Sequence, residues 1–191
     1  NPIVEQLKFD LNTYGYSLCI TDTKGTHADL TPDYAAIPQE MKKAAECFGK
    51  NFLGEVSKEE IINNITRIRD CAGDRAALRA LHFVCENERV KEEVDALRKN
   101  NFPQFLTKVK ESGDSSFKYL QNVYTCHDVQ HQNVSIALAL SDVIFGEKSV
   151  CRVHGGGFAG TIQAFVPNYL VSNYQKEMDK ILGNGSCEVL K

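Results

Sequence analysis

Three consecutive glycines, Gly155, Gly156 and Gly157, stand between two β-prone runs in the segment 151–166, which reads CRVHGGGFAGTIQAFV. Glycine lacks a Cβ, so such a loop can adopt positive φ angles and bring its backbone close to another group. Consecutive backbone amides in this geometry can form a concave anion site. The alternative is a tight strand connection in which the glycines serve only the bend. The segment therefore indicates either an anion-binding loop or a plain hairpin.

Two known nucleotide-binding patterns fit these glycines only in part. Gly155, Gly157 and Gly160 satisfy the G-x-G-x-x-G dinucleotide fingerprint, but that fingerprint requires a helix after the glycines. The run 161–166 alternates and is β-prone, and Pro167 ends it, which argues against a dinucleotide site. A protein-kinase glycine loop does lie between two strands, but the V-A-I-K, H-R-D and D-F-G motifs are absent. The sequence thus excludes a protein kinase.

Several histidines invite a chemical interpretation that their neighbours do not support. Cys126, His127 and His131 could begin a metal site, yet no further ligand follows at a suitable spacing, so a polar helix start is preferred. His27 and Asp29 could form an acid–base pair, but no nucleophile lies nearby in the sequence. A loop hydrogen bond is the simpler expectation for that pair.

Two further polar positions lie near predicted element ends. Asp74 with Arg75 and Arg79 could clamp an anion, although a solvated first turn of a helix with local ion pairs is preferred. His154 directly precedes the glycines and could face a phosphate, but it also fits the alternation of its strand as filler. Neither position is taken as a site residue.

Composition limits the class of protein. The chain has 191 residues, of which 42% are hydrophobic and 25% charged, which fits one globular domain with a real core. The net charge of −3 does not suggest a nucleic-acid or membrane partner, and no apolar run reaches the roughly 20 residues that span a bilayer. Seven scattered cysteines without a C-x-x-C motif predict free buried thiols in a reducing cytoplasm rather than a disulfide scaffold.

The periodicity predicts an α+β fold with helices packed on a mixed or antiparallel sheet. Two early strands are expected at Ile3–Asp10 and Tyr16–Thr23, and a late hairpin surrounds the glycines. A helix follows Thr31, with Pro38 as its possible regular start, and Ser57 and Glu60 form a capping box for the next. The remaining predicted elements are helices over 74–99, from Pro103 with a kink at Gly113, from about Asp128 to Gly146 and over 170–182, and a strand at 187–190.

The amino-acid sequence of the glycine segment is more specific than the spacing of its glycines. The run 152–160, RVHGGGFAG, resembles the third signature motif of the GHMP small-molecule kinases, and within that superfamily it looks most like galactokinase. Segment 27–37, HADLTPDYAAI, is similar to that family's sugar-side segment, and shorter matches occur at 80–90, 111–117 and 136–140. The resemblance runs over nearly the whole chain and covers the C-terminal half of the family's protein.

This resemblance implies a function for a larger protein. The chain, residues 1–191, would be the single C-terminal, ferredoxin-like GHMP domain with additional helices. The parent would transfer the γ-phosphoryl group of ATP to the anomeric hydroxyl of galactose with Mg2+. Tyr34 would contact the substrate, and Gly155, Gly156 and Gly157 would support the phosphate-binding loop, while Phe158 packs beneath it.

The resemblance also implies what lies elsewhere. The catalytic residues, the phosphate-binding loop and the metal ligands would belong to an N-terminal domain on which this chain docks. No ATP, Mg2+ or other cofactor is therefore expected on this chain alone, which would be inactive. The start at Asn1-Pro2, without methionine, leads us to expect a piece of a longer protein.

Three alternatives remain open at this point. The parent could be an inactive galactokinase-like sensor that binds galactose and ATP and signals to a protein partner. The chain could instead be a free-standing interaction domain that uses the same fold. Another GHMP kinase, such as a homoserine or mevalonate kinase, would share the glycine loop, although segment 27–37 argues against it.

Overall fold

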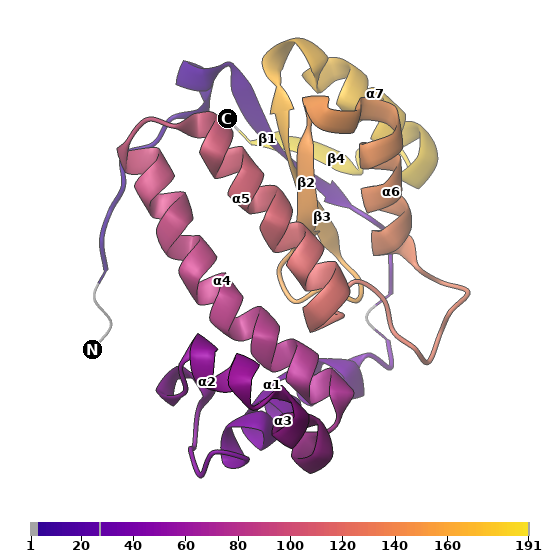
Figure 1. Ribbon diagram of the computed structural model, residues 1–191. Coiled ribbons are helices and arrows are strands. Elements are labelled where there is room, and N and C mark those ends of the chain that lie inside the picture. Colours follow the sequence, from indigo (N-terminus) through magenta and orange to yellow (C-terminus); the bar gives the residue numbers. More distant parts are fainter. Residues whose placement is uncertain (1–3, 27, 191) are drawn as a thin grey trace.

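The computed structural model describes residues 4–26 and 28–190 and has an α+β architecture (Figure 1). Its sheet is antiparallel and has the order β2-β3-β1-β4. The strands are β1 Tyr16–Asp22, β2 Val150–His154, β3 Thr161–Pro167 and β4 Cys187–Leu190. The fold class expected from the sequence is thus confirmed, with the antiparallel form of the sheet.

The helices divide between the sheet and a separate bundle. Figure 1 shows α4 and α5 side by side, joined by a short turn, with α1, α2 and α3 gathered around the beginning of α4. The helices are α1 Thr31–Glu46, α2 Lys58–Asn63, α3 Ile65–Ala72, α4 Asp74–Arg98, α5 Phe102–Ser115, α6 Asn133–Phe145 and α7 Val171–Leu182. No helix in the described part of the chain combines the length and apolar character that a bilayer crossing needs.

Strand alternation gives each face of the sheet its own core. On β3, Phe165 packs with α5 residues such as Phe105. Its neighbour Ala164 points to the other face, where α7 supplies the fully buried Tyr174 and Met178. Side chains of successive strand residues point to opposite faces, so helices cover the sheet on both sides. Burying this apolar surface is the main stabilising term of such a fold.

The bundle of α1, α2, α3 and the first half of α4 has a core of its own. Ala44 and Ala45 from α1, Ile61 from α2 and Ile68 from α3 are fully buried there, together with Ala80 from α4. Ser57 caps α2 by accepting a bond from the Glu60 amide, as the capping box predicted. The bundle therefore holds α1 firmly against α4.

Some predicted element boundaries were wrong. Residues 4–10 of the expected strand Ile3–Asp10 form no strand, and Ile3 lies outside the described residues. A 3-10 turn, Leu11–Tyr14, precedes β1 instead. Helix α1 runs without interruption through Pro38, because its packing against α4 outweighs the local cost of a proline. The expected start of α6 at Asp128 was five residues too early. The Asp128 carboxylate instead accepts hydrogen bonds from the backbone amides of Gln130 and His131 within a loop.

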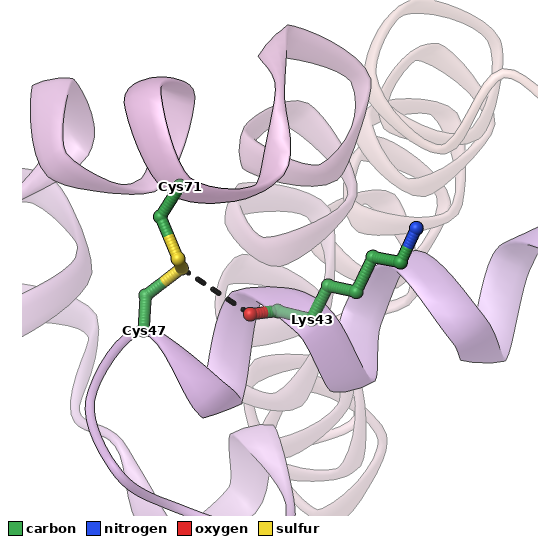
Figure 2. Close-up of a disulfide and its surroundings, with 3 residues drawn as sticks. All are labelled: Lys43, Cys47 and Cys71. Carbon is green, nitrogen blue, oxygen red and sulfur yellow. Dashed lines mark hydrogen bonds between the residues drawn. A yellow bond between two sulfur atoms is a disulfide. The ribbon is translucent and has the colours of Figure 1, made fainter.

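The prediction of free buried cysteines was wrong for one pair, which is bonded, and for Cys126, which is exposed. Cys47 at the end of α1 and Cys71 in α3 form a disulfide, with Cα atoms 6.2 Å apart (Figure 2). The Sγ of Cys47 also lies 3.2 Å from the carbonyl oxygen of Lys43 in the same helix. The spacing of the cysteines could not show this pairing, because it depends on how α1 and α3 pack. The five free cysteines are Cys19, Cys85, Cys126, Cys151 and Cys187.

Candidate functional site

The glycine segment forms the hairpin between β2 and β3, and we call residues 155–160 the glycine hairpin. It takes left-handed backbone angles at Gly155 (φ +73°), Gly157 (φ +82°), Phe158 (φ +57°) and Gly160 (φ +89°). Gly155 and Gly156 are exposed, whereas Gly157 and Phe158 are buried. The tip therefore faces outward, while the base is anchored in the protein. Strand β3, and not a helix, directly follows the glycine hairpin, which agrees with the prediction that it is no dinucleotide site.

Tyr34 and the glycine hairpin, which lie far apart in the sequence, come into direct contact. The Tyr34 hydroxyl donates a 2.8 Å hydrogen bond to the carbonyl oxygen of Gly157. The rings of Tyr34 and Phe158 meet edge to face with centroids 5.2 Å apart. A Cβ at Gly156 would lie 3.0 Å from the Tyr34 ring. Phe158 thus packs beneath the loop as expected, and the glycine permits close approach of the tyrosine.

The environment of Tyr34 keeps its hydroxyl neutral. Burial raises the pKa of this phenol, and the negative charge of the adjacent Asp33 raises the pKa further. The neutral hydroxyl can therefore donate to the Gly157 carbonyl throughout the physiological pH range.

Asn122 holds the other side of the glycine hairpin and was not singled out by the sequence. Its backbone carbonyl accepts a 2.5 Å bond from the Phe158 amide, and its Nδ2 donates to the Gly156 carbonyl at 3.2 Å. A Cβ on Gly157 would fall 1.9 Å from the Asn122 carbonyl oxygen, so only glycine fits there. No sequence pattern could have found Asn122, because the left-handed backbone of the preceding residue, Gln121, is not marked by a glycine or asparagine.

A pocket of about 570 Å3 opens beside the base of the glycine hairpin. Phe158 and Ala159 form one wall, and residues from the segments 24–26, 28–33 and 125–133 contribute the others. Its lining is mixed in charge, with Lys24 and two histidines beside three aspartates. Neither Tyr34 nor the three glycines line this pocket. Gly155 and Gly156 are exposed, Tyr34 is partly buried and Gly157 is buried.

The other predicted polar positions have local partners. His154 is exposed and its Nδ1 lies 2.9 Å from Thr161 Oγ1 on the neighbouring strand. His131 pairs with Asp128 at 2.7 Å. His27 lies outside the described residues. No group of three or more His, Cys, Asp or Glu side chains that could hold a metal ion occurs among residues 4–26 and 28–190.

The prediction of a solvated first turn at 74–79 was wrong for Arg79. Asp74 does pair locally with Arg69, but the Arg79 side chain is only 1% exposed. Both Arg75 and Arg79 bind Glu40 of α1. The reason is the bundle of α1, α2 and α3, which covers this turn of α4 and converts a predicted surface arginine into a buried one.

Comparison with known proteins supports the resemblance to galactokinases that the sequence motifs indicate. No protein-family model matches the chain. The galactokinase of Glaesserella parasuis is 30% identical over 171 residues, which are 85% of this chain and 42% of that protein. The galactokinase of Haemophilus influenzae is 29% identical over 160 residues, 84% of this chain and 40% of that protein. The chain thus spans about two-fifths of the length of the curated relatives it matches.

A solved structure supports the fold. The crystal structure of Lactococcus lactis galactokinase complexed with galactose aligns with a TM-score of 0.70 and 23% identity, covering 92% of this chain and 44% of that chain. The chain therefore shares its fold with the aligned part of that galactokinase. The sequence matches show that the chain is a relative of the galactokinases, as the motifs predicted.

Proposed function

We propose that this chain is the C-terminal domain of a galactokinase, whose whole protein transfers the γ-phosphoryl group of ATP to the anomeric hydroxyl of galactose. The contact between the Tyr34 hydroxyl and the Gly157 carbonyl carries the proposal, because it joins the sugar-side segment to the third motif at one place. The relationship to galactokinases supplies the reaction and the substrates.

In this proposal, Tyr34 contacts the sugar. A phenol hydroxyl donates one hydrogen bond and can also accept, so Tyr34 can bind a sugar hydroxyl while it donates to Gly157. The edge-to-face contact with Phe158 fixes the ring, which favours binding because little side-chain freedom remains to be lost.

The glycine hairpin serves as a support for the phosphate-binding loop of a second domain. Gly155 and Gly156 are exposed at its tip, and without side chains they let a neighbouring backbone approach closely. The buried base, held by Asn122 and Tyr34, keeps the tip in place. The second domain would dock over this tip and close the active site.

The described residues do not fit a magnesium site, since no suitable cluster of His, Cys, Asp or Glu occurs among them. In this proposal, as the resemblance to galactokinases implies, the metal ligands, the catalytic base and the nucleotide cradle come from the second domain. By itself the chain neither binds MgATP usefully nor phosphorylates a sugar.

The test compares the chain with the protein encoded when the reading frame is extended upstream of Asn1. Each is incubated with MgATP and galactose, homoserine or mevalonate, and ADP and the phosphorylated product are measured. We expect galactose phosphorylation by the extended protein and none by the chain. Sugar phosphorylation by the chain alone would overturn the proposal that a second domain supplies the catalytic residues. No galactose phosphorylation by the extended protein, or a preference for another substrate, would overturn the assignment as a galactokinase.

A further inference from the structure

A buried arginine of α4 connects two parts of the protein that both hold the glycine hairpin. Arg79 Nη1 lies 2.8 Å from Glu40 Oε2 on α1. Its Nε donates a 3.0 Å hydrogen bond to the carbonyl oxygen of Leu120. Leu120 is the last residue of a short π-helix, Ser116–Leu120, that follows α5. The side chain is 1% exposed, so both bonds are made away from water.

The Leu120 carbonyl stands two residues before Asn122. The chain reverses at Gln121, which has a φ of +55° and whose amide bonds back to Ser116. Asn122 then presents its carbonyl to the Phe158 amide and its Nδ2 to the Gly156 carbonyl. A shift of the Leu120 carbonyl would therefore move the groups that hold the glycine hairpin.

Glu40 closes the connection from the other side. It lies on α1, the helix that also carries Tyr34, and Tyr34 binds the Gly157 carbonyl. Arg79 thus joins α1 to the segment 120–122, and both of these hold the same hairpin. Together these links form a closed path, which we call the ring. Helix α1 connects Tyr34 to Glu40, Glu40 binds Arg79, and Arg79 binds the Leu120 carbonyl. The chain then leads to Asn122, and both Asn122 and Tyr34 bind the glycine hairpin.

Burial of a guanidinium is a poor way to gain stability, because desolvation offsets much of the attraction to a carboxylate. The guanidinium group of arginine holds its N–H donors in fixed directions, so it can fix the relative positions of two groups that it binds. The two bonds of Arg79 leave from different nitrogens, one toward the carboxylate and one toward the peptide carbonyl. Lysine, with a single ammonium group, could keep the ion pair but could not make both bonds in the same directions.

We infer that Arg79 is a positioning residue for the glycine hairpin: by binding Glu40 and the Leu120 carbonyl together, it sets the place of Asn122 relative to Tyr34. The contribution to catalysis rests on the proposed function, whereas the positioning itself is a property of this chain.

Arg75 provides a matched comparison. It also binds Glu40, with Nη2 2.5 Å from Oε1, but its side chain is 41% exposed and none of its described hydrogen bonds reaches the segment 120–122. Arg75→Lys therefore perturbs the same carboxylate without removing the bond to Leu120. Arg79→Lys perturbs both.

The experiment measures amide hydrogen exchange by NMR on the 15N-labelled chain, with global stability measured in parallel by urea unfolding. After correction for any change in global stability, we expect Arg79→Lys to speed exchange of the Phe158 amide at least tenfold. Arg75→Lys should leave that rate within about twofold of the unchanged chain. Equal rates in the two variants would overturn the inference.

Should Arg79→Lys not fold, Glu40→Gln gives a second test, because it removes the charge that Arg79 binds on α1 and leaves the side chains of Arg79 and Asn122 unchanged. After the same correction for global stability, we expect Glu40→Gln to speed exchange of the Phe158 amide more than Arg75→Lys does. An exchange rate equal to that of Arg75→Lys would overturn the inference. Neither measurement needs a substrate, so their outcome is independent of the kinase assay.

Discussion

The Tyr34 hydroxyl donates to the carbonyl oxygen of Gly157 across a separation of 123 residues in the sequence, at 2.8 Å. This bond brings the beginning of α1 and the glycine hairpin into contact. It also ties the helical bundle to the sheet, because Tyr34 belongs to α1 and Gly157 to the hairpin of β2 and β3. The first prediction concerns this bond.

Tyr34→Phe should lower the free energy of unfolding by about 1 kcal/mol, the usual net value of one hydrogen bond, because the Gly157 carbonyl loses its donor. In the extended protein, the Michaelis constant for galactose should rise more than that for ATP. Urea unfolding and steady-state kinetics measure the two effects. Tyr169→Phe is the control, since that ring is 78% exposed. Equal effects from the two substitutions would contradict the role of Tyr34.

Gly157→Ala should destabilise the chain by about 3 kcal/mol or more. A Cβ there would lie 1.9 Å from the Asn122 carbonyl, and the left-handed backbone adds its own cost of about 1–2 kcal/mol. Gly15→Ala has a similar φ of +73° with no atom within 4 Å of the added Cβ, so it should show only the backbone cost. Thermal or urea unfolding of both variants separates the two contributions, and similar losses would contradict the close contact at Gly157.

The disulfide can be tested by alkylation. In protein purified without reductant, the exposed Cys126 should be labelled by iodoacetamide, whereas Cys71, although it lies at the surface, should be labelled only after reduction. Peptide mass spectrometry reads out both sites in one sample. Labelling of Cys71 before reduction would show that the bond with Cys47 does not form.

The same bond should stabilise the fold. It closes a loop over a sequence separation of 24, for which chain entropy predicts about 3 kcal/mol. Cys71→Ser should lower the free energy of unfolding by that amount in non-reducing buffer and have little effect in buffer with excess dithiothreitol. A loss of the same size in both buffers would point to packing of Cys71 rather than to the bond.

Glu40 gives the chain an acid-sensitive contact. Burial acts to raise the pKa of its carboxyl, but hydrogen bonds and charges from Arg75 and Arg79 outweigh burial and hold the pKa below its ordinary value. A lowered folded-state pKa contributes stability above the unfolded value, about 4.3, and that contribution is lost as the pH falls through the folded value.

Urea unfolding from pH 7 to pH 3 tests this expectation. The difference in unfolding free energy between the unchanged chain and Glu40→Gln should be constant above about pH 5.5 and shrink below about pH 4.3. A difference that stays constant down to pH 3 would mean that Glu40 keeps an ordinary pKa.

Local patterns predicted the second half of the fold well. The alternating runs around the glycines became β2 and β3, and the amphipathic stretch predicted at 170–182 became α7, Val171–Leu182. Both patterns arise because one face of the element is buried, so apolar residues recur at regular intervals in the sequence. Residues 4–10, which were expected to form a strand, form none. The disulfide depends on how α1 packs against α3, and no local sequence pattern shows this.

The candidate site was predictable only in part. Tyr34, Gly155, Gly156 and Gly157 came from a resemblance to known motifs, and their roles stay predictions. Asn122 was missed because its contribution is mostly a backbone carbonyl, which any residue type supplies. The burial of Arg79 was missed because a charged residue in a first helical turn ordinarily faces water, and only the covering bundle reverses this.

The most direct measurement is the rate of galactose phosphorylation by the extended protein carrying Gly157→Ala, beside the unchanged protein and Gly15→Ala. If the glycine hairpin forms one wall of the kinase site, Gly157→Ala should lose at least a hundredfold in kcat/KM at a temperature where it remains folded, while Gly15→Ala stays near the unchanged rate. Phosphorylation by folded Gly157→Ala at the unchanged rate would contradict the account.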